Sequence, residues 1–340
     1  MNNQVKPIDE WRQVDSRTLA EEIIPRYRPA VIRGYVDHWP SVQAARSGPG
    51  AICDYLRRHD NGTPVDAISV PTEYHGRLFY NRDMTGFNFA KGSASITRFC
   101  EQLRHCTTLK KPPSLAVQSA LIADCLPGFL KENGLAALSP AIQPRIWFGN
   151  RFVVPAHVDE SNNIACVVSG RREFTLFPPE QVANLYIGPL DFTPTGLPIS
   201  IVDHRQPDFD RFPRYRDAMA HALTATLEPG DAIYIPTLWW HRVESLDDYN
   251  TLVNYWWKDL PGATYPPESM FYSLYHVLLN IKALPAAHRQ AWGAIFNHYL
   301  FDEAEDPAAH IPPEARGILG PLSAERARKI KEVLAGLLRN

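Results

Sequence analysis

Three side chains in this sequence have the types and the spacing of a metal site. His157 and Asp159 stand two residues apart in PAHVDESNN, between apolar and β-branched runs that predict strands. Residues i and i+2 of a strand point to the same face, so the imidazole and the carboxylate would share one space. They are then either a hydrogen-bonded pair or two ligands of one metal ion. A third ligand would favour the metal.

His241 is the candidate for that third ligand. It follows a turn and a short apolar strand in GDAIYIPTLWWHRVESL, 241 − 157 = 84 residues after His157. Two histidines and one carboxylate form a facial triad, which leaves three positions of an octahedron open for an organic acid and O₂. This set suits Fe(II), whereas a structural zinc site would use a fourth protein ligand. The alternative is a surface pair, or a core histidine capped by a carboxylate, because this short spacing often arises by chance.

The segments around these residues predict a mainly β core flanked by helical parts. Between 112 and 258, short apolar runs alternate with turn clusters and show no βαβ order, which favours a barrel or a sandwich. Residues 1–111 contain both strand and helix patterns, with helices expected at 16–27 and 95–106. After a proline-rich connection at 258–269, the apolar residues recur with the period of a helix. We therefore predict an N-terminal α/β segment (1–111), a β core (112–258) and a C-terminal helical region (259–340).

Four motifs resemble, in order and spacing, the jumonji C (JmjC) hydroxylases among the cupin-like proteins. They are PAHVDESNN, GRREFTLFPPEQ, GDAIYIPTLWWHRVESL and VNYWWK, and the resemblance covers roughly residues 18–258. Within this family the sequence is most similar to the asparaginyl hydroxylases that act on hypoxia-inducible factor. The resemblance implies a core of double-stranded β-helix (jelly-roll) type, an Fe(II) centre and 2-oxoglutarate as co-substrate.

The resemblance also implies a role for each matching residue. His157, Asp159 and His241 would bind Fe(II) and form the catalytic centre. Arg172, where the family usually has lysine, would hold the far carboxylate of 2-oxoglutarate through two parallel hydrogen bonds. The other matches lie beside the metal and the co-substrate: Asn163, Asn254 and Trp256. The implied reaction hydroxylates a substrate that the sequence does not specify, and converts 2-oxoglutarate into succinate and CO₂.

Two positions depart from the pattern of the asparaginyl hydroxylases. Val154 replaces a threonine, and Ala116 replaces a tyrosine, so two polar helpers of the co-substrate pocket are lost. This loss favours an alternative function, that of a metal-binding cupin without oxygenase activity, such as an isomerase or a small-molecule binder. A non-catalytic scaffold is a third alternative. If Arg172 is not the anchor of the carboxylate, the next candidates are Arg151, Arg171 and Lys258.

Composition narrows the partners and the compartment. The formal net charge of −2 argues against a general attraction to nucleic acid or to anionic membranes. No stretch approaches the roughly 18 apolar residues of a membrane span. The five cysteines form no CxxC pair, and the first residues lack the apolar run of a signal peptide. We therefore expect a cytoplasmic protein with reduced thiols.

The C-terminal helices carry apolar stripes that are long for a peripheral appendage. In the last helix, Val333, Leu334 and Leu337 share one face, and charged residues occupy the other. A helix with one such stripe buries it against a partner surface. We therefore predict a homodimer formed by helices within 268–340.

Overall fold

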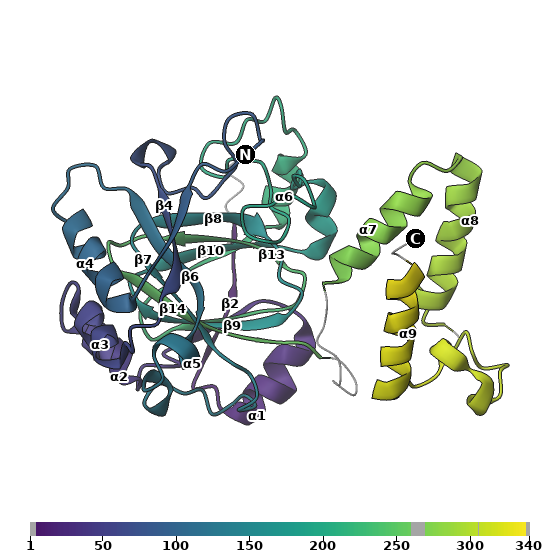
Figure 1. Cartoon of the computed structure of the whole chain (residues 1–340), viewed down its shortest axis with the longest axis horizontal. Helices are drawn as coiled ribbons and strands as arrows, with labels where there is room; N and C mark the ends of the chain where they lie inside the picture. The colour runs from purple at the N-terminus through teal and green to yellow at the C-terminus, as the bar shows by residue number, and fades with distance from the viewer. Residues whose placement is uncertain (1–4, 260–268, 305, 338–340) are drawn as a thin grey trace. The chain divides into compact units, whose positions relative to one another are not determined.

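The computed structural model describes the chain except for residues 1–4, 260–268, 305 and 338–340 (Figure 1). The chain divides into two compact units, which we call the barrel unit (1–259) and the C-terminal unit (260–340). All strands of the described residues lie in the barrel unit. The proline-rich connection expected at 258–269 lies mostly outside the described residues.

Eight antiparallel strands form a jelly roll at the centre of the barrel unit. Their bounds are Arg145–Gly149 (β7), Phe152–His157 (β8), Asn162–Ser169 (β9), Arg172–Phe177 (β10), Leu223–Leu227 (β11), Ala232–Ile235 (β12), Trp240–Ser245 (β13) and Asn250–Trp257 (β14). One sheet contains the strands in the order β11-β10-β13-β8, and the other contains them in the order β12-β9-β14-β7. The chain crosses repeatedly between the two sheets, which confirms the predicted mainly β fold of jelly-roll type.

Six further strands extend these sheets into a five-stranded and a nine-stranded sheet. They are Lys6–Pro7 (β1), Asp9–Arg12 (β2), Ala30–Arg33 (β3), Val65–Val70 (β4), Ala90–Ala94 (β5) and Ser114–Leu121 (β6). Strand β1 pairs with β11, and the others lengthen the second sheet on both sides, with β5 at one edge. The N-terminal segment is therefore continuous with the β core through backbone hydrogen bonds.

Helices cover the outer face of the nine-stranded sheet. The helices of the barrel unit are Ser16–Thr18 (α1), Pro40–Arg46 (α2), Ala51–His59 (α3), Ile96–Cys106 (α4), Ile122–Cys125 (α5) and Tyr215–His221 (α6). Unlike the others, α6 contacts β10 of the five-stranded sheet. Trp39, Leu56 and Phe99 from this layer share one buried cluster with Ile164 and Val253 of the sheet. Figure 1 shows α2, α3 and α4 grouped on one side of the sheets.

The helix expected at 16–27 is less regular than its sequence pattern suggests. The Asp15 carboxylate caps α1 by accepting a hydrogen bond from the Thr18 backbone N–H at 2.7 Å. The helix then continues as a wider turn over Leu19–Ile23 and a tighter one over Ile24–Arg26. Pro25 has no N–H for the helical ladder, and Tyr27 adopts a left-handed φ of 49°, which ends the segment.

A second apolar cluster fills the space between the two sheets of the jelly roll. It contains Phe174, Leu176 and Val243 from one sheet, and Val167 and Leu252 from the other. These residues alternate with outward-facing neighbours along each strand, as the two-residue period of a strand requires. The interior of the barrel is therefore a dry, low-dielectric environment in which any polar side chain needs a partner.

The C-terminal unit contains helices Met270–Ile281 (α7), Ala286–Phe296 (α8) and Ala324–Leu337 (α9). The Ser323 hydroxyl accepts a hydrogen bond from the Arg326 backbone N–H at 3.2 Å and so caps the start of α9. Of the helices described, none has both the length and the apolar character needed to cross a bilayer.

The turn between β9 and β10 depends on Gly170, whose φ is +67°. A Cβ at this position would lie 2.5 Å from the Tyr249 carbonyl oxygen. Gly170→Ala should therefore lower the free energy of unfolding by at least about 2 kcal/mol, because left-handed strain and a backbone clash add. Urea unfolding followed by tryptophan fluorescence measures this change.

Gly196→Ala is the matched control. Its φ is +83°, but a Cβ would meet no atom within 4 Å, so only the left-handed strain of about 1–2 kcal/mol remains. Equal destabilisation by the two substitutions would show that the clash with Tyr249 does not matter.

Candidate metal centre

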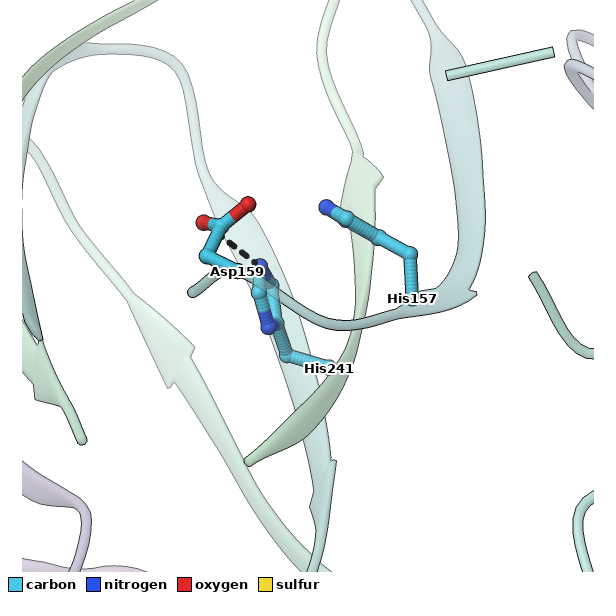
Figure 2. A group of neighbouring side chains, drawn as sticks. All are labelled: His157, Asp159 and His241. Atoms are coloured by element: carbon cyan, nitrogen blue, oxygen red, sulfur yellow. Dashed lines mark ion pairs between the residues drawn. The ribbon is translucent and has the colours of Figure 1, made fainter. Parts of the chain in front are cut away.

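His157, Asp159 and His241 converge at one end of the jelly roll. Each offers one ligand atom, and these three atoms lie within 4.8 Å of one another. The Nε2 atom of His241 lies 3.5 Å from the Asp159 carboxylate, and the centres of the two imidazole rings are 4.1 Å apart. Figure 2 shows the three side chains pointing into the same space.

The prediction that His157 and Asp159 share a strand is only half right. His157 is the last residue of β8, and Asp159 lies in the segment that follows. The backbone carbonyl of Asp159 accepts a hydrogen bond from the Leu238 N–H at 2.8 Å, which ties this segment to the approach of β13. The carboxylate thus reaches the histidines from a loop rather than from a strand face.

A β-bulge in β8 directs His157. His157 lies opposite His241 and Val154 lies opposite Val243, so three steps along β8 match two steps along β13. The extra residue falls at Pro155 or Ala156, where a proline breaks the regular ladder. Because of the bulge, Val154 and His157 line the same cleft although they are three residues apart.

Backbone carbonyls set the protonation of both imidazole rings. The Nδ1 atom of His157 is 2.9 Å from the Pro155 carbonyl oxygen, and that of His241 is 3.0 Å from the Trp239 carbonyl oxygen. A carbonyl oxygen only accepts, so each Nδ1 carries the hydrogen and each Nε2 keeps a free lone pair. This is the tautomer that binds a metal through Nε2.

The electrostatic environment keeps His157 uncharged. Burial and, to a smaller extent, the neighbouring His241 lower the pKa of His157 to about 4, whereas Asp159 opposes the shift. A neutral imidazole is the form that coordinates a metal. The Trp256 indole N–H donates at 3.1 Å to the Asp159 carboxylate oxygen that lies 3.5 Å from His241 Nε2, and this hydrogen bond orients the carboxylate toward the histidines.

This donor set fits a divalent metal with open positions. Metal–ligand bonds of about 2.1 Å would place neighbouring ligand atoms about 3 Å apart in an octahedron. The observed separations of up to 4.8 Å therefore require the side chains to close slightly around the ion. In the described residues no fourth histidine, cysteine or carboxylate joins the group, as expected for a site that leaves room for other ligands.

A cleft of about 530 Å³ opens beside the candidate metal centre and is lined by two of its residues, His157 and Asp159. Its walls come from β4 to β8, from β14 and from the segment 193–197. Several of the residues that line the cleft are polar or aromatic and could contact a ligand: Gln118, Ser119, Trp147, Thr193, Thr195 and Trp256. A cleft of this size accepts a small organic molecule or a single extended side chain.

Arg172 lies inside the barrel, at the end opposite the candidate metal centre. Its side chain shares the inward face of β10 with Phe174 and Leu176, and the residue is 7% exposed. Its Nε has no hydrogen-bond partner, and no carboxylate contacts the side chain within the described part of the chain. Burial lowers the pKa of Arg172 to about 9. A buried cation without an anion is costly, so this one indicates a negatively charged ligand.

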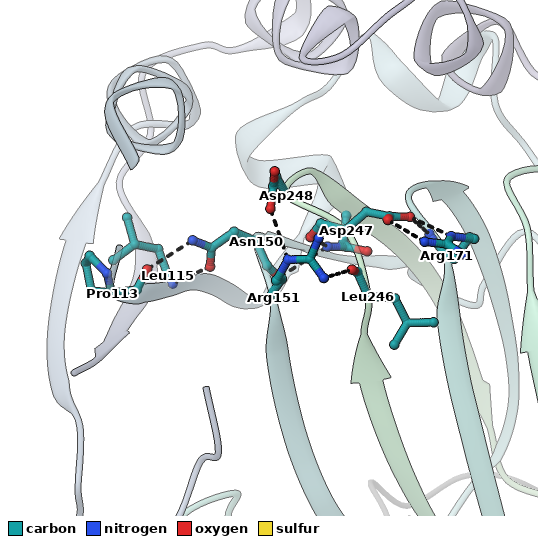
Figure 3. Close-up of polar contacts among 9 residues, drawn as sticks. Pro113, Leu115, Asn150, Arg151, Arg171, Leu246, Asp247 and Asp248 are labelled. Atoms are coloured by element: carbon teal, nitrogen blue, oxygen red, sulfur yellow. Dashed lines mark hydrogen bonds and ion pairs between the residues drawn. The ribbon is translucent and has the colours of Figure 1, made fainter. Parts of the chain in front are cut away.

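Two other candidate anchors face away from the barrel interior. Arg171 forms an ion pair with Asp247 at 2.9 Å, and Arg151 forms one with Asp248 at 3.1 Å (Figure 3). Both guanidinium groups are at least half exposed and already hold a carboxylate. The third candidate, Lys258, follows the last residue of β14 and does not line the cleft.

The two predicted asparagines lie beside each other on β9 and β14. The Asn254 side-chain N–H donates to the Asn163 side-chain oxygen at 2.8 Å, and both residues are buried. The Asn254 side-chain oxygen has no partner. In register, Asn163 lies opposite Trp256, which brings the pair next to the metal end of the barrel.

Val154 and Ala116 belong to one apolar cluster with Ile68, Leu78 and Phe152. In the asparaginyl hydroxylases these two positions carry the hydroxyl groups of a threonine and a tyrosine. This apolar cluster offers no polar group in their place. Trp147, which sequence reasoning missed, lines the cleft and meets Trp256 edge-on at 6.2 Å. The run RIWFG is apolar on both faces, so its sequence gives no signal of which face is inside.

A jelly roll with two histidines and an aspartate at its open end is the architecture of a cupin-type metal site. The chain belongs to the cupin-like domain family, whose sequence profile matches residues 16–263. The zebrafish tRNA wybutosine-synthesizing protein 5 is 31% identical over 281 residues, which is 75% of this chain and 76% of that protein.

Two further relatives match over shorter segments. Human HSPB1-associated protein 1 is 35% identical over 131 residues, or 38% of this chain and 25% of that protein. The Arabidopsis lysine-specific demethylase JMJ31 is 35% identical over 102 residues, or 30% of this chain and 18% of that protein. The match with these two thus spans a quarter or less of their length. The similarity to asparaginyl hydroxylases stays a prediction, since these relatives carry other names.

His157→Ala or Asp159→Ala should lower the affinity for Fe(II) or Mn(II) by more than about 100-fold. Even residues that only orient a metal ligand cost about 10–100-fold when lost, so a ligand itself should cost more. Anaerobic calorimetry measures the affinity, and circular dichroism checks the fold. His38→Ala, at an exposed position, is the control. Metal binding like that of the parent by either triad variant would contradict the assignment.

Proposed function

We propose that this chain is an Fe(II)- and 2-oxoglutarate-dependent oxygenase that hydroxylates an organic substrate. The observation that carries the proposal is Arg172, a buried cation without an anion in the same barrel as the triad. A site that only stores a metal has no need for such a cation. A dicarboxylic oxoacid does need it, because one end chelates the metal while the other end is a carboxylate.

Each residue then has a defined task. His157, Asp159 and His241 would hold Fe(II), which supplies the activation of O₂ when it is bound. Arg172 would bind the far carboxylate of 2-oxoglutarate. In the balanced reaction a substrate C–H becomes C–OH, and 2-oxoglutarate becomes succinate and CO₂. One oxygen atom of O₂ enters the substrate hydroxyl group, and the other enters succinate. The cleft of about 530 Å³ would admit the substrate.

The alternative is a metal-binding cupin without oxygenase activity. It is favoured by Val154 and Ala116, because the apolar cluster they join cannot hydrogen-bond a co-substrate. The two functions differ in one measurement, the release of CO₂ from 2-oxoglutarate labelled at its first carbon, with Fe(II), O₂ and ascorbate present. An oxygenase gives slow release without substrate, whereas His241→Ala abolishes it. No release by the parent protein with metal bound would favour the alternative.

The relatives' names bear on the primary substrate. One is named a lysine-specific demethylase and another a tRNA wybutosine-synthesizing protein. The formal net charge of −2 argues against tRNA for this chain, so we propose a protein side chain or a small molecule. Stimulation of succinate formation by peptide pools, but not by bulk tRNA, would support this choice, and the reverse result would oppose it.

Arg172→Met should weaken 2-oxoglutarate binding by at least about 100-fold and leave metal affinity unchanged, because two charge-assisted hydrogen bonds are lost. Without ligand, the same change should raise the free energy of unfolding by about 1–4 kcal/mol, since it removes a buried unpaired charge. Calorimetry and urea unfolding measure the two effects.

Arg172→Lys is the matched control, because lysine is the residue usual in the resembling family. It should retain part of the affinity while keeping the charge. Unchanged 2-oxoglutarate binding by Arg172→Met would place the carboxylate anchor elsewhere.

The C-terminal unit supports a proposal about assembly. Its helices expose large apolar side chains: Leu279 is 82% exposed, Leu337 68% and Leu334 53%. The opposite face of α9 carries ion pairs such as Lys329–Glu325 at 2.8 Å. Exposed apolar faces of this kind usually cover one another. We propose that helices within 268–340 form a two-fold homodimer interface.

Leu334→Arg should convert the dimer into a monomer, because it places a charge in the apolar stripe of α9. Light scattering should then give a mass near 38.4 kDa instead of twice that value. Ala335→Arg adds the same charge outside the stripe and should leave the dimer intact. A parent protein that is already monomeric would overturn the proposal.

A further inference from the structure

The indole of Trp147 is a hydrogen-bond donor without a partner in the metal cleft. Its Nε1 is buried and makes no hydrogen bond, although the residue lines the cleft with His157 and Asp159. The neighbouring indole of Trp256 differs, because it donates to Asp159 at 3.1 Å. A buried donor that lacks a partner is destabilising, and a phenylalanine would fill much of the same space without that cost. An unpaired donor in a cleft therefore points to an acceptor on a ligand.

Strand register places Trp147 at the depth of Arg172. Trp147 lies opposite Leu252 on β14, four residues before Trp256 at the metal end. Arg172 lies opposite Ser245 on β13, four residues after His241 at the metal end. Four residues of a strand span about 13 Å. The two side chains therefore start from equal depths on the two facing sheets.

The path between the metal and Arg172 passes Trp147. On β10, the inward face runs from Arg172 through Phe174 to Leu176, which lies opposite His241. Trp147 packs against the cluster that contains Phe174 and Leu176. Its ring also reaches toward the metal end, since its centre is 6.2 Å from that of Trp256. A molecule that extends from the triad to Arg172 would thus run alongside the Trp147 indole.

The chemistry of a carboxylate makes this donor useful. A carboxylate has about four acceptor sites, and one guanidinium occupies two of them. The positions that would supply hydroxyl groups, Val154 and Ala116, are apolar and lie in a single apolar cluster. Among the described residues, Arg172 Nε and Trp147 Nε1 are buried donors without a partner that start at the same depth of the barrel.

We propose that Trp147 donates its indole N–H to the far carboxylate of the oxoacid, and that Trp147 and Arg172 together select a dicarboxylic oxoacid. This proposal rests on the proposed function, since it concerns the same co-substrate. It makes Trp147 a specificity-determining residue that takes the place of the missing hydroxyl groups. The indole is rigid and apolar around its single donor, so it also keeps water away from the ion pair.

The test compares two oxoacids of equal length. Anaerobic calorimetry on the Mn(II)-loaded protein would measure the affinity for 2-oxoglutarate and for 2-oxopentanoate, which has a methyl group in place of the far carboxylate. Trp147→Phe should weaken 2-oxoglutarate binding by about tenfold or more and leave the binding of 2-oxopentanoate unchanged. Incorporation of β-(3-benzothienyl)alanine at position 147, which keeps the ring shape but has no N–H, should have the same effect.

Trp239→Phe is the matched control. The indole N–H of Trp239 is also buried and unpartnered, and its ring lies in the same apolar cluster, but it does not line the cleft. This change should affect the two oxoacids equally or not at all. In the Zn(II)-loaded protein, 2-oxoglutarate should shift the Trp147 indole N–H resonance downfield, which a purely structural role would not produce.

The outcomes separate the two proposals. A parent protein that binds 2-oxoglutarate no better than 2-oxopentanoate would overturn the 2-oxoglutarate part of the proposed function, and the role of Trp147 with it. A parent that discriminates, together with a Trp147→Phe variant that discriminates equally, would overturn only the role of Trp147. Loss of discrimination in Trp239→Phe to the same extent would show that packing, and not the N–H, is responsible.

Discussion

The pairing of β8 with β13 is the constraint on which the site depends. It sets His157 directly opposite His241, so that two imidazoles from distant parts of the chain meet at the open end of the barrel. The bulge between Val154 and His157 aims the first imidazole, and the Pro155 and Trp239 carbonyls fix which nitrogen of each ring is free. On the other side of β13, β10 pairs with it and places Leu176 directly opposite His241. A one-residue slip of this register would turn one of the two candidate ligand histidines to the other face of the sheet.

The low dielectric of the barrel interior links stability to function. Arg172, Trp147 and Asn254 each keep a polar atom without a partner, surrounded by residues such as Phe174 and Leu252. Burial of such groups opposes folding, and the same burial strengthens any hydrogen bond that a ligand makes to them. The barrel tolerates these groups because a large apolar layer surrounds them and two sheets hold them in place. Strained or unsatisfied groups of this kind are typical of binding sites, where stability is given up for recognition.

The departures from the resembling family change how the co-substrate end of the barrel is built. Hydroxyl groups at 116 and 154 would each need a hydrogen-bond partner, whereas Val154 and Ala116 instead close an apolar wall with Ile68 and Phe152. Under the proposed function, recognition of a carboxylate would rest on two donors, the guanidinium of Arg172 and the indole N–H of Trp147. Arginine suits this arrangement because its fork binds a carboxylate in a fixed geometry. The membership in the cupin-like domain family fixes the scaffold, and these interior side chains decide what the scaffold binds.

Local sequence patterns alone determined the β core, the two long C-terminal helices α7 and α9, and the candidate triad. Periods of two and of 3.6 residues are local properties, and the spacing of His157, Asp159 and His241 is visible without any coordinates. The inward position of Arg172 can also be derived from the sequence, because in a strand it shares a face with the apolar residues Phe174 and Leu176. Only the tertiary structure decided that Asp159 reaches the site from a loop, that a bulge follows Val154, and that Arg172 has no partner. It alone showed Trp147 in the cleft, because RIWFG places apolar residues on both faces and so does not reveal which face lines the interior. Pairing between distant strands settles these points, and a sequence records such pairing only indirectly.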